Sequence, residues 1–384
     1  MKRDYYLDNA ATSFPKAPGV GKAMADYIDT VGRNVGRGSY TSAQAAAGVV
    51  WETREQLCRL MGAPAPQNVV FTSGATCGLN LLLKGLLRPG DRVLTSPMEH
   101  NAVLRPLRQL EAHGVIVEEL PCNEAGQLLT EELSVLLPGT RVLALTHASN
   151  LTGGLMPLAQ VGALCQAAGV FFLVDAAQSA GHVPIDMASM GIDGLALPGH
   201  KGLLGPQGIG AVLLTDALAQ ALEPLIAGGT GSLSESLEMP PFLPDRLEAG
   251  TLNLPGIYGL HAALAYFEPR ADAIMDRQRR LGGHLWARLT ELAGDGLVIP
   301  GPGFRDRVGV VSVDFQNRDN GEMAFLLEQN YGIQTRSGLH CAPSAHRHLG
   351  TFPRGMVRFS VGPETTFEGI DYVQGAVYEL LTSN

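Results

Sequence analysis

The feature that most constrains the fold is an alternation of short apolar runs with helical patterns over the first two-thirds of this 384-residue chain. Each apolar run predicts a buried strand of about four to seven residues. Because such alternation places crossover helices on both faces of a sheet, it predicts an α/β protein with a mostly parallel sheet. The predicted strands lie within 68–74, 91–97, 115–121, 140–147, 170–177 and 209–215, and the predicted helices at 75–87, 103–114 and 158–169.

The pattern changes after residue 228. A Gly/Ser/Pro-rich stretch at 228–256 predicts a long functional or interface loop. A helical region at 257–292, strands at 308–315 and 356–362, a helix at 321–332 and a terminal amphipathic helix follow. We therefore expect a large α/β domain over 16–256 and a smaller α+β domain formed by 1–15 and 257–384.

Composition narrows the functional class. The chain is 45% hydrophobic and 17% charged, which is typical of a soluble globular protein. A net charge of −9 without a basic run argues against nucleic acid or a membrane surface as partner. No signal peptide or membrane span is evident, so we expect a cytoplasmic protein. Five scattered cysteines indicate reduced thiols, and no metal, dinucleotide or P-loop pattern occurs.

Lys201 lies in a glycine-rich, apolar segment directly after His200. A desolvated lysine loses its charge and becomes a nucleophile that can form a Schiff base. Asp175 ends the most hydrophobic predicted strand, where a buried carboxylate needs a cationic partner, and the ring nitrogen of pyridoxal phosphate is such a partner. We therefore expect a pyridoxal-phosphate site, with a solvated loop lysine and a helix-capping aspartate as the alternatives.

Polar side chains follow other predicted strands as well. The segment 72–80 offers a helix N-terminus to a phosphate, unless Thr72 or Ser73 simply caps that helix. His100 can stack on an aromatic cofactor and move protons, or can be an ordinary loop histidine. Asn150 and Gln178 can contact a phenolate oxygen, or can form local turns.

A second group of reactive residues lies near the C-terminus. Cys341 lies in a loop next to His340 and near Arg336, and cationic neighbours favour a nucleophilic thiolate. Arg358 is a charge inside an apolar strand, explained equally well by a substrate carboxylate or by a structural salt bridge. We expect the remaining cysteines Cys58, Cys77 and Cys165 to pack, and assign no role to Cys122.

Together these segments resemble the class V, fold type I pyridoxal-phosphate enzymes, and within them the group II cysteine desulfurases and selenocysteine lyases. The resemblance runs nearly from end to end. It is carried by the segments LDNAAT (7–12), RNVGRGSYTSA (33–43), FTSGAT (71–76), EHNAV (99–103), SNLTG (149–153), VDAAQSAGHVPIDM (174–187), PGHKGLLGPQGIG (198–210), EAGTLN (248–253), RSGLHCAP (336–343) and the strand around Arg358.

The resemblance implies a large, mostly parallel seven-stranded sheet domain, a small C-terminal α+β domain and a homodimer with shared active sites. It implies that the catalytic residues are Lys201, Cys341 and His100, and that Arg358 with Asn34 and Arg336 binds the substrate. Lys201 carries the cofactor, Asp175 pairs with its pyridine nitrogen, and Thr251 reaches the phosphate of the neighbouring subunit. The implied cofactor contacts are Ala75, Thr76, His100, Asn150, Asp175, Gln178, His200, Lys201 and Thr251.

The function implied by the resemblance is conversion of L-cysteine to L-alanine, with sulfur held as a persulfide on Cys341 for a sulfur-acceptor protein. The alternatives are a selenocysteine lyase, a class V aminotransferase or β-lyase in which Cys341 is incidental, and a non-catalytic binding module. Three positions depart from the family pattern: Pro198 replaces a phosphate-binding serine, and Gly36 and Leu339 replace histidines.

Overall fold

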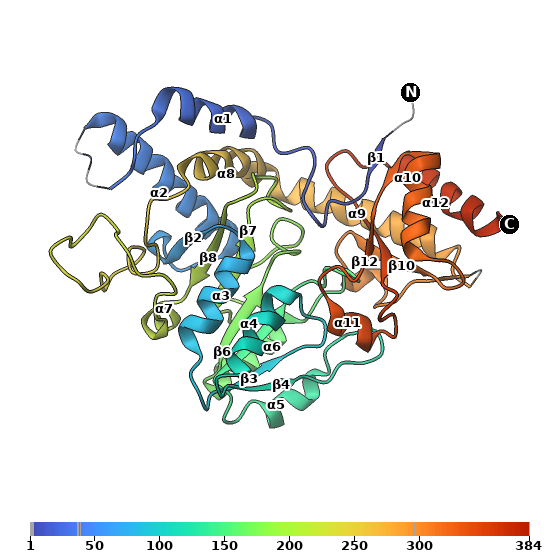
Figure 1. Cartoon of the computed structure of the whole chain (residues 1–384), viewed down its shortest axis with the longest axis horizontal. Helices are drawn as coiled ribbons and strands as arrows, with labels where there is room; N and C mark the ends of the chain where they lie inside the picture. The colour runs from blue at the N-terminus through green and yellow to red at the C-terminus, as the bar shows by residue number, and fades with distance from the viewer. Residues whose placement is uncertain (1–3, 37, 39, 295, 384) are drawn as a thin grey trace.

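The computed structural model describes residues 4–36, 38, 40–294 and 296–383. Its centre is a seven-stranded sheet in the order β2-β8-β7-β6-β5-β3-β4 (Figure 1). The sheet is mostly parallel, and β8 is antiparallel to both of its neighbours. Its strands are β2 (Val69–Thr72), β3 (Arg92–Thr95), β4 (Ile116–Glu119), β5 (Val142–Thr146), β6 (Phe171–Asp175), β7 (Gly194–Pro198) and β8 (Gly210–Leu214).

Helices cover both faces of this sheet, because side chains alternate along each buried strand. In β5, Leu143 and Leu145 join the apolar cluster that contains residues of α2, α6 and α8, whereas Val142 and Ala144 join the cluster with α3, α4 and α7. These helices are α2 (Thr41–Met61), α3 (Ala75–Leu86), α4 (Asn101–Glu111), α6 (Leu158–Ala168), α7 (Asp216–Ala221) and α8 (Leu254–Phe267).

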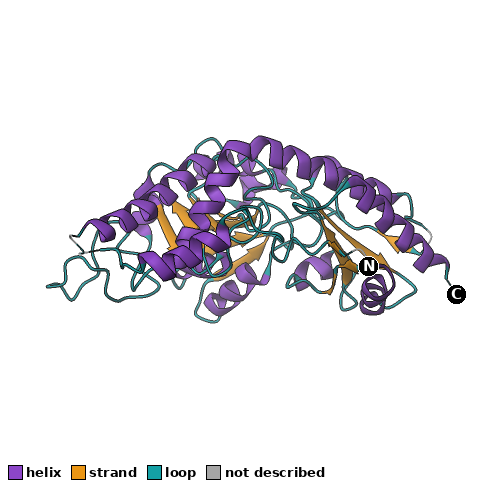
Figure 2. Cartoon of the chain, turned by 90° about the horizontal axis from the view of Figure 1, so that it is seen from above, coloured by secondary structure: helices purple, strands orange, loops and turns teal. Residues whose placement is uncertain are grey.

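A smaller C-terminal part lies beside the large sheet, with α9 (Ala271–Thr290) leading from one to the other (Figures 1 and 2). Its four-stranded antiparallel sheet has the order β12-β13-β10-β9 and has its own apolar cluster with α9, α10 and α12. Its remaining elements are β9 (Leu297–Val298), β10 (Val310–Phe315), α10 (Asn320–Tyr331), β11 (Ile333–Gln334), β12 (Arg336–Gly338), α11 (Pro343–His348), β13 (Met356–Ser360) and α12 (Phe367–Thr382).

The N-terminal segment crosses to this C-terminal part. β1 (Tyr5–Tyr6) pairs in parallel with β11, and Asp8 forms a β-bridge with Ser360. Minor helical elements complete the described chain: α1 (Val20–Asp26), η1 (Tyr27–Val31), η2 (Pro66–Asn68), η3 (Thr130–Glu132), α5 (Leu133–Leu136), η4 (Glu268–Arg270) and η5 (Phe304–Asp306).

The structure confirms all six strands and three helices expected in the first two-thirds, and corrects three details. β4 is not buried: it forms the edge of the sheet, and Ile116 is half exposed. β7, which leads directly to Lys201, was missed because GLALP is short and ends in proline. The helix expected over 257–292 is broken at Glu268–Arg270, where Pro269 cannot donate an N–H.

Among the described residues, no helix is long and apolar enough to cross a membrane. The stretch from residue 228 to Asn253 contains no helix or strand, as expected for a long loop. All five cysteines are free thiols, and Cys58 and Cys165 are buried in the core as expected.

Candidate active site

The carboxyl ends of five strands surround one cavity of about 230 Å³. β2 leads into α3, β3 leads to His100, β5 to Asn150, β6 ends at Asp175 and β7 leads to Lys201. Polar residues gather there because parallel strands end at the same edge of the sheet. Eight of the expected site residues line the cavity: Ala75, Thr76, His100, Asn150, Asp175, Gln178, His200 and Lys201.

Lys201 and Asp175 form the electrostatic centre of this cavity. Burial lowers the pKa of Lys201 to about 8, while the charge of Asp175 opposes that shift. Burial also raises the pKa of Asp175, and the backbone N–H of Ala177 and the charge of Lys201 act against this. The Ala177 N–H donates to Oδ1 of Asp175 at 2.8 Å. Asp175 therefore caps a turn and also lines the cavity, and the lowered pKa makes a larger fraction of Lys201 neutral near pH 7 than of an ordinary lysine.

The N-terminus of α3 forms an anion-binding end of the cavity. Gly74 precedes the helix with φ +148°, and neither Thr72 nor Ser73 caps it. The first N–H groups of α3 therefore have no side-chain cap, and Ala75 and Thr76 of this first turn line the cavity at the positive end of the helix dipole. Pro198 also lines the cavity and brings no N–H or hydroxyl, whereas Ser73, the first turn of α3 and His200 line the cavity and carry hydrogen-bond donors.

The N-terminal segment holds the loop that carries Lys201. Nδ1 of His200 lies 3.0 Å from the Thr12 hydroxyl, and the His200 carbonyl accepts a hydrogen bond from Nζ of Lys16 at 2.8 Å. Burial and the charges of Lys201 and Lys16 lower the pKa of His200 to about 4. His200 is therefore neutral at physiological pH and can donate through one ring nitrogen only.

His100 has a double role. Its Nδ1 accepts a hydrogen bond from the backbone N–H of Ala102 at 2.9 Å and so caps α4. Burial, together with the charge of Lys201, lowers its pKa to about 4. The ring is thus a neutral imidazole with its proton on Nε2, which leaves Nε2 for contacts in the cavity.

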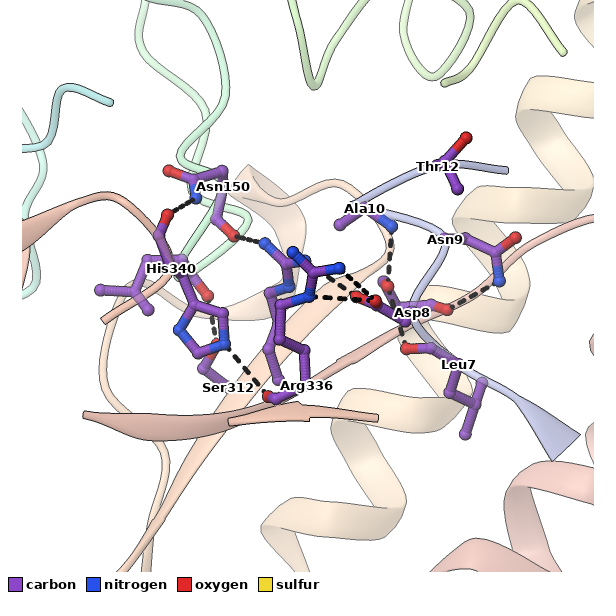
Figure 3. Close-up of polar contacts among 12 residues, drawn as sticks. Leu7, Asp8, Asn9, Ala10, Thr12, Asn150, Ser312, Arg336 and His340 are labelled. Carbon is purple, nitrogen blue, oxygen red and sulfur yellow. Dashed lines mark hydrogen bonds and ion pairs between the residues drawn. The ribbon is translucent and has the colours of Figure 1, made fainter. Parts of the chain in front are cut away.

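Asn150 and Gln178 link the cavity to other segments. Gln178 donates to the backbone carbonyl of Ala10 at 2.8 Å. Nδ2 of Asn150 donates to the carbonyl of His340 at 2.7 Å, while Oδ1 of Asn150 is buried without a partner (Figure 3). Nδ2 of Asn150 therefore binds the cysteine loop, and Oδ1 remains able to accept a hydrogen bond.

The cysteine loop lies directly against this site. His340 and Cys341 both have left-handed backbones, with φ of 49° and 57°. Such conformations persist in non-glycine residues only when surrounding contacts fix them. Here Asn150 holds the His340 carbonyl, and the N–H of Asn101, next to His100, donates to the Cys341 carbonyl at 2.7 Å. Cys341 is thus anchored through its backbone, and its side chain is exposed.

Arg336 and Arg358 lie on the adjacent strands β12 and β13, and Asp8 contacts both. Nη2 of Arg358 lies 3.0 Å from Oδ1 of Asp8, and Nη2 of Arg336 lies 2.9 Å from Oδ2. Nη1 of Arg358 donates to the Asn150 carbonyl at 3.0 Å, and Nε is buried without a partner. The structural salt bridge considered for Arg358 therefore exists, and donors remain for a ligand.

Two expected site residues lie elsewhere in this chain. Asn34 and Thr251 line a separate cavity of about 670 Å³ between α2 and the long loop. The structure does not bring Asn34 to Arg358 within one chain. Two residues of the 33–43 segment, Arg37 and Ser39, lie outside the described residues.

Three residues near the site were missed or misjudged from the sequence. Asp8 was part of a quoted segment without a role, because its partners are more than 300 residues away. Cys77, expected to pack, lines the cavity. Glu99 is fully buried behind His100, and burial raises its pKa to about 8. No local pattern distinguishes any of the three.

These features fit pyridoxal phosphate. The uncapped N-terminus of α3 suits a phosphate, the buried Asp175 suits a protonated pyridine nitrogen, and Lys201 suits an aldehyde. His100 and Asn150 line the same cavity, and Oδ1 of Asn150 is buried there without a partner. Within the described part of the chain, no group of His, Cys, Asp and Glu side chains could hold a metal ion.

Comparisons with known proteins identify the family of this chain. Residues 5–373 match the family described as Aminotransferase class-V. Cysteine desulfurase CsdA of Escherichia coli is 34% identical, over 97% of this chain and 92% of that protein.

Two solved structures are similar over most of their length. The apo cysteine desulfurase of Thermococcus onnurineus has a TM-score of 0.91 at 31% identity, and covers 98% of this chain and 94% of its own. The S-sulfonic acid form of CsdA has a TM-score of 0.86 at 31% identity, with the same coverage. The chain therefore belongs to the class V aminotransferase family of pyridoxal-phosphate-dependent enzymes, in which its relatives are cysteine desulfurases.

Proposed function

We propose that this protein is a cysteine desulfurase that converts L-cysteine to L-alanine and holds the sulfur as a persulfide on Cys341. The observation that carries the proposal is the anchoring of an exposed Cys341 to the wall of the Lys201 cavity. Asn150 and Asn101, which hold the backbone of the cysteine loop, lie in or next to that wall. A thiol unrelated to the reaction does not need this strained, doubly anchored backbone.

The proposal assigns cofactor contacts to the residues that line the cavity. Lys201 would hold the aldehyde, Asp175 the ring nitrogen, and the N–H groups of Ala75 and Thr76 with His200 the phosphate. His100, Asn150 and Gln178, which line the same cavity, would contact the ring and its oxygen. When bound, pyridoxal phosphate supplies an acceptor for the electron pair left on the substrate α-carbon.

The chain's own residues then carry the remaining steps. Arg358 binds the substrate carboxylate, and the neutral amine of Lys201 removes the α-proton. Cys341 attacks the substrate sulfur as a thiolate, so that the carbon–sulfur bond breaks and a sulfur–sulfur bond forms. The products are L-alanine and a Cys341 persulfide, which balances one L-cysteine and one thiol. The exposure of Cys341 supports release of that sulfur to an acceptor protein.

We also propose a homodimer that shares its active sites, located in the cytoplasm. Asn34 and Thr251 then serve the cavity of the partner subunit, Thr251 at its phosphate and Asn34 at its substrate carboxylate. Large apolar side chains are exposed on the segments around these residues, which supports burial by a second copy. They are Ile28, Tyr40, Trp51, Ile226, Leu233, Leu237 and Phe242. The free thiols support a reducing compartment.

One assay tests the proposed activity. The purified holoenzyme is incubated with L-cysteine or L-selenocysteine, with and without Cys341→Ala, and alanine, sulfide or selenide and keto acid are measured. A desulfurase forms alanine from cysteine and loses that activity with Cys341→Ala. If the wild type and Cys341→Ala turn over selenocysteine equally and neither turns over cysteine, the protein is a selenocysteine lyase. A keto acid product identifies an aminotransferase, and no product at all identifies a binding module.

A further inference from the structure

His340 and Cys341 occupy the centre of a tight turn between β12 and α11. The N–H of Ala342 donates to the carbonyl of Leu339 at 2.9 Å and closes the turn around them. Both central residues have left-handed backbones, with φ of 49° and 57°. Residues other than glycine disfavour this conformation, so the turn needs contacts that hold it.

The buried ring of His340 supplies such contacts. Its Nε2 lies 3.1 Å from the backbone carbonyl of Arg336, in the strand that leads into the turn (Figure 3). The ring also stacks on that of His346, with centroids 6.0 Å apart and planes at 15°. His340 is 8% exposed, whereas Cys341 is an exposed residue. Two contacts therefore fix the ring, while the neighbouring thiol stays accessible.

His346 is itself a fixed support for this ring. It is fully buried on α11, and its Nδ1 lies 2.7 Å from the Thr351 hydroxyl. Its backbone carbonyl accepts a hydrogen bond from the N–H of Thr351 at 2.8 Å. The stacked pair of rings therefore joins the cysteine loop to the segment that follows α11.

The ring of His340 is neutral. A carbonyl only accepts hydrogen bonds, so Nε2 carries the ring proton, and Nδ1, which is buried without a partner, is unprotonated. Burial, together with the charge of Arg358, lowers the pKa of His340 to about 3. The sequence suggested His340 as a cationic neighbour of the Cys341 thiol, but its neutral ring does not supply that charge.

We propose that His340 is a positioning residue for sulfur transfer, whose ring fixes the left-handed turn that presents the Cys341 thiol to the substrate sulfur. The proposal rests on the persulfide role of Cys341 under the proposed function. His340 contacts Asn150, which lines the Lys201 cavity, through its backbone carbonyl and not through its ring. Removal of the ring should therefore slow the sulfur step and spare the chemistry at the substrate α-carbon.

Two measurements on the holoenzyme separate these steps. Mass spectrometry of rapidly quenched, alkylated protein after addition of L-cysteine gives the rate of persulfide formation on Cys341. Exchange of the α-proton of L-alanine with deuterium oxide, followed by NMR, reports the chemistry of the Lys201 cavity without a sulfur step. His340→Ala should slow persulfide formation by about tenfold or more and keep alanine exchange within about twofold of the wild type.

Two matched variants show whether the effect belongs to the ring contacts. His340→Gln keeps a neutral side chain with an N–H that can donate to the Arg336 carbonyl, and should restore most of the rate of persulfide formation. His348→Ala is the control, because this imidazole of α11 also contacts a backbone carbonyl, that of Asn123 at 2.7 Å, outside the turn. It should leave both rates unchanged.

His340→Gly keeps the test decisive if His340→Ala does not fold, because glycine adopts a left-handed backbone without strain. It should also slow persulfide formation, since the turn is then tolerated but no longer fixed. Persulfide formation at the wild-type rate in His340→Ala or His340→Gly, or an equal loss of alanine exchange, contradicts the proposal. Failure of the desulfurase assignment is a separate outcome, because no persulfide then forms in the wild type itself.

Discussion

At the scale of single residues, the environment of Lys201 distinguishes it from a second lysine with a similar pKa. Burial lowers the pKa of both Lys16 and Lys201 to about 8. The Lys16 ammonium donates hydrogen bonds to the hydroxyls of Thr12 and Ser13 and to the His200 carbonyl. Only Lys201 lies in the cavity with Asp175. A lowered pKa therefore does not identify the cofactor lysine, whereas the pocket around it does.

Replacement of each lysine by alanine tests this distinction. Lys201→Ala should abolish the visible absorbance of bound pyridoxal phosphate and reduce turnover by about a thousandfold or more, because one group both holds the cofactor and moves the proton. Lys16→Ala should keep that absorbance. Loss of the absorbance band in Lys16→Ala, or its survival in Lys201→Ala, would show that Lys201 is not the lysine that binds the cofactor. Absorption spectra of dialysed proteins give the answer.

The pKa of Lys201 predicts how the apoenzyme binds its cofactor as pH changes. An amine attacks an aldehyde only when it is deprotonated. Well below pH 8 the neutral fraction of Lys201 rises about tenfold per pH unit, reaches about one half at pH 8 and is nearly complete above about pH 9. The rate of cofactor binding should therefore rise through pH 8 and level off above about pH 9. Stopped-flow absorbance measures it, and a rate that keeps rising to pH 10 points to an ordinary lysine.

At the scale of elements, a buried ion pair ties α2 to β2 and to the long loop. Arg54 and Glu248 are almost fully buried and lie 2.6 Å apart, and Glu248 also accepts from the N–H of Phe71. Removing one partner leaves the other charge buried and unpaired. Arg54→Ala should therefore lower the free energy of unfolding by about 3–5 kcal/mol.

Urea denaturation measures this loss against a matched control. Lys22→Ala removes an exposed pair with Asp26 and should change the unfolding free energy by less than about 1 kcal/mol. Similar small effects for both variants would show that the Arg54–Glu248 pair does not hold the loop.

The order of elements was largely predictable from the sequence, because buried strands and helices leave periodic patterns. The strand end at Asp175 and the place of His100 in the segment after β3 could be found for the same reason. β7 was missed because a five-residue strand that ends in proline has too little periodicity to be recognised. The burial of β4 was misjudged because the order of strands in the sheet, which the sequence pattern does not show, decides which strand lies at the edge. The contacts of Asp8 and the anchoring of Cys341 depend on residues far apart in the chain, so no local pattern reveals them.

In the whole molecule, the proposed homodimer would account for two features that one copy of the chain leaves unexplained. Asn34 and Thr251 line their own cavity, away from Lys201. The long loop beside them carries Leu237, whose side chain is fully exposed. Apolar surface of this kind is usually buried by a partner.

A charge placed on this surface should disrupt the dimer. Leu237→Arg puts a cation where we expect an apolar contact, so sedimentation velocity should show more monomer than in the wild type, together with weaker cofactor binding. Val135→Arg is the control, because Val135 is also exposed but lies on α5, which does not line the Asn34 cavity. A monomeric wild type, or a dimer unaffected by Leu237→Arg, would rule out this interface.

In the proposed reaction, one chain combines the cofactor chemistry of Lys201 with sulfur capture by Cys341. Mass spectrometry of alkylated peptides from holoenzyme treated with L-cysteine detects that captured sulfur. We expect one added sulfur atom on the peptide that contains Cys341, formed together with alanine and absent in Lys201→Ala. Alanine formation with an unmodified Cys341, or an added sulfur on Cys77 or Cys122 instead, would contradict it.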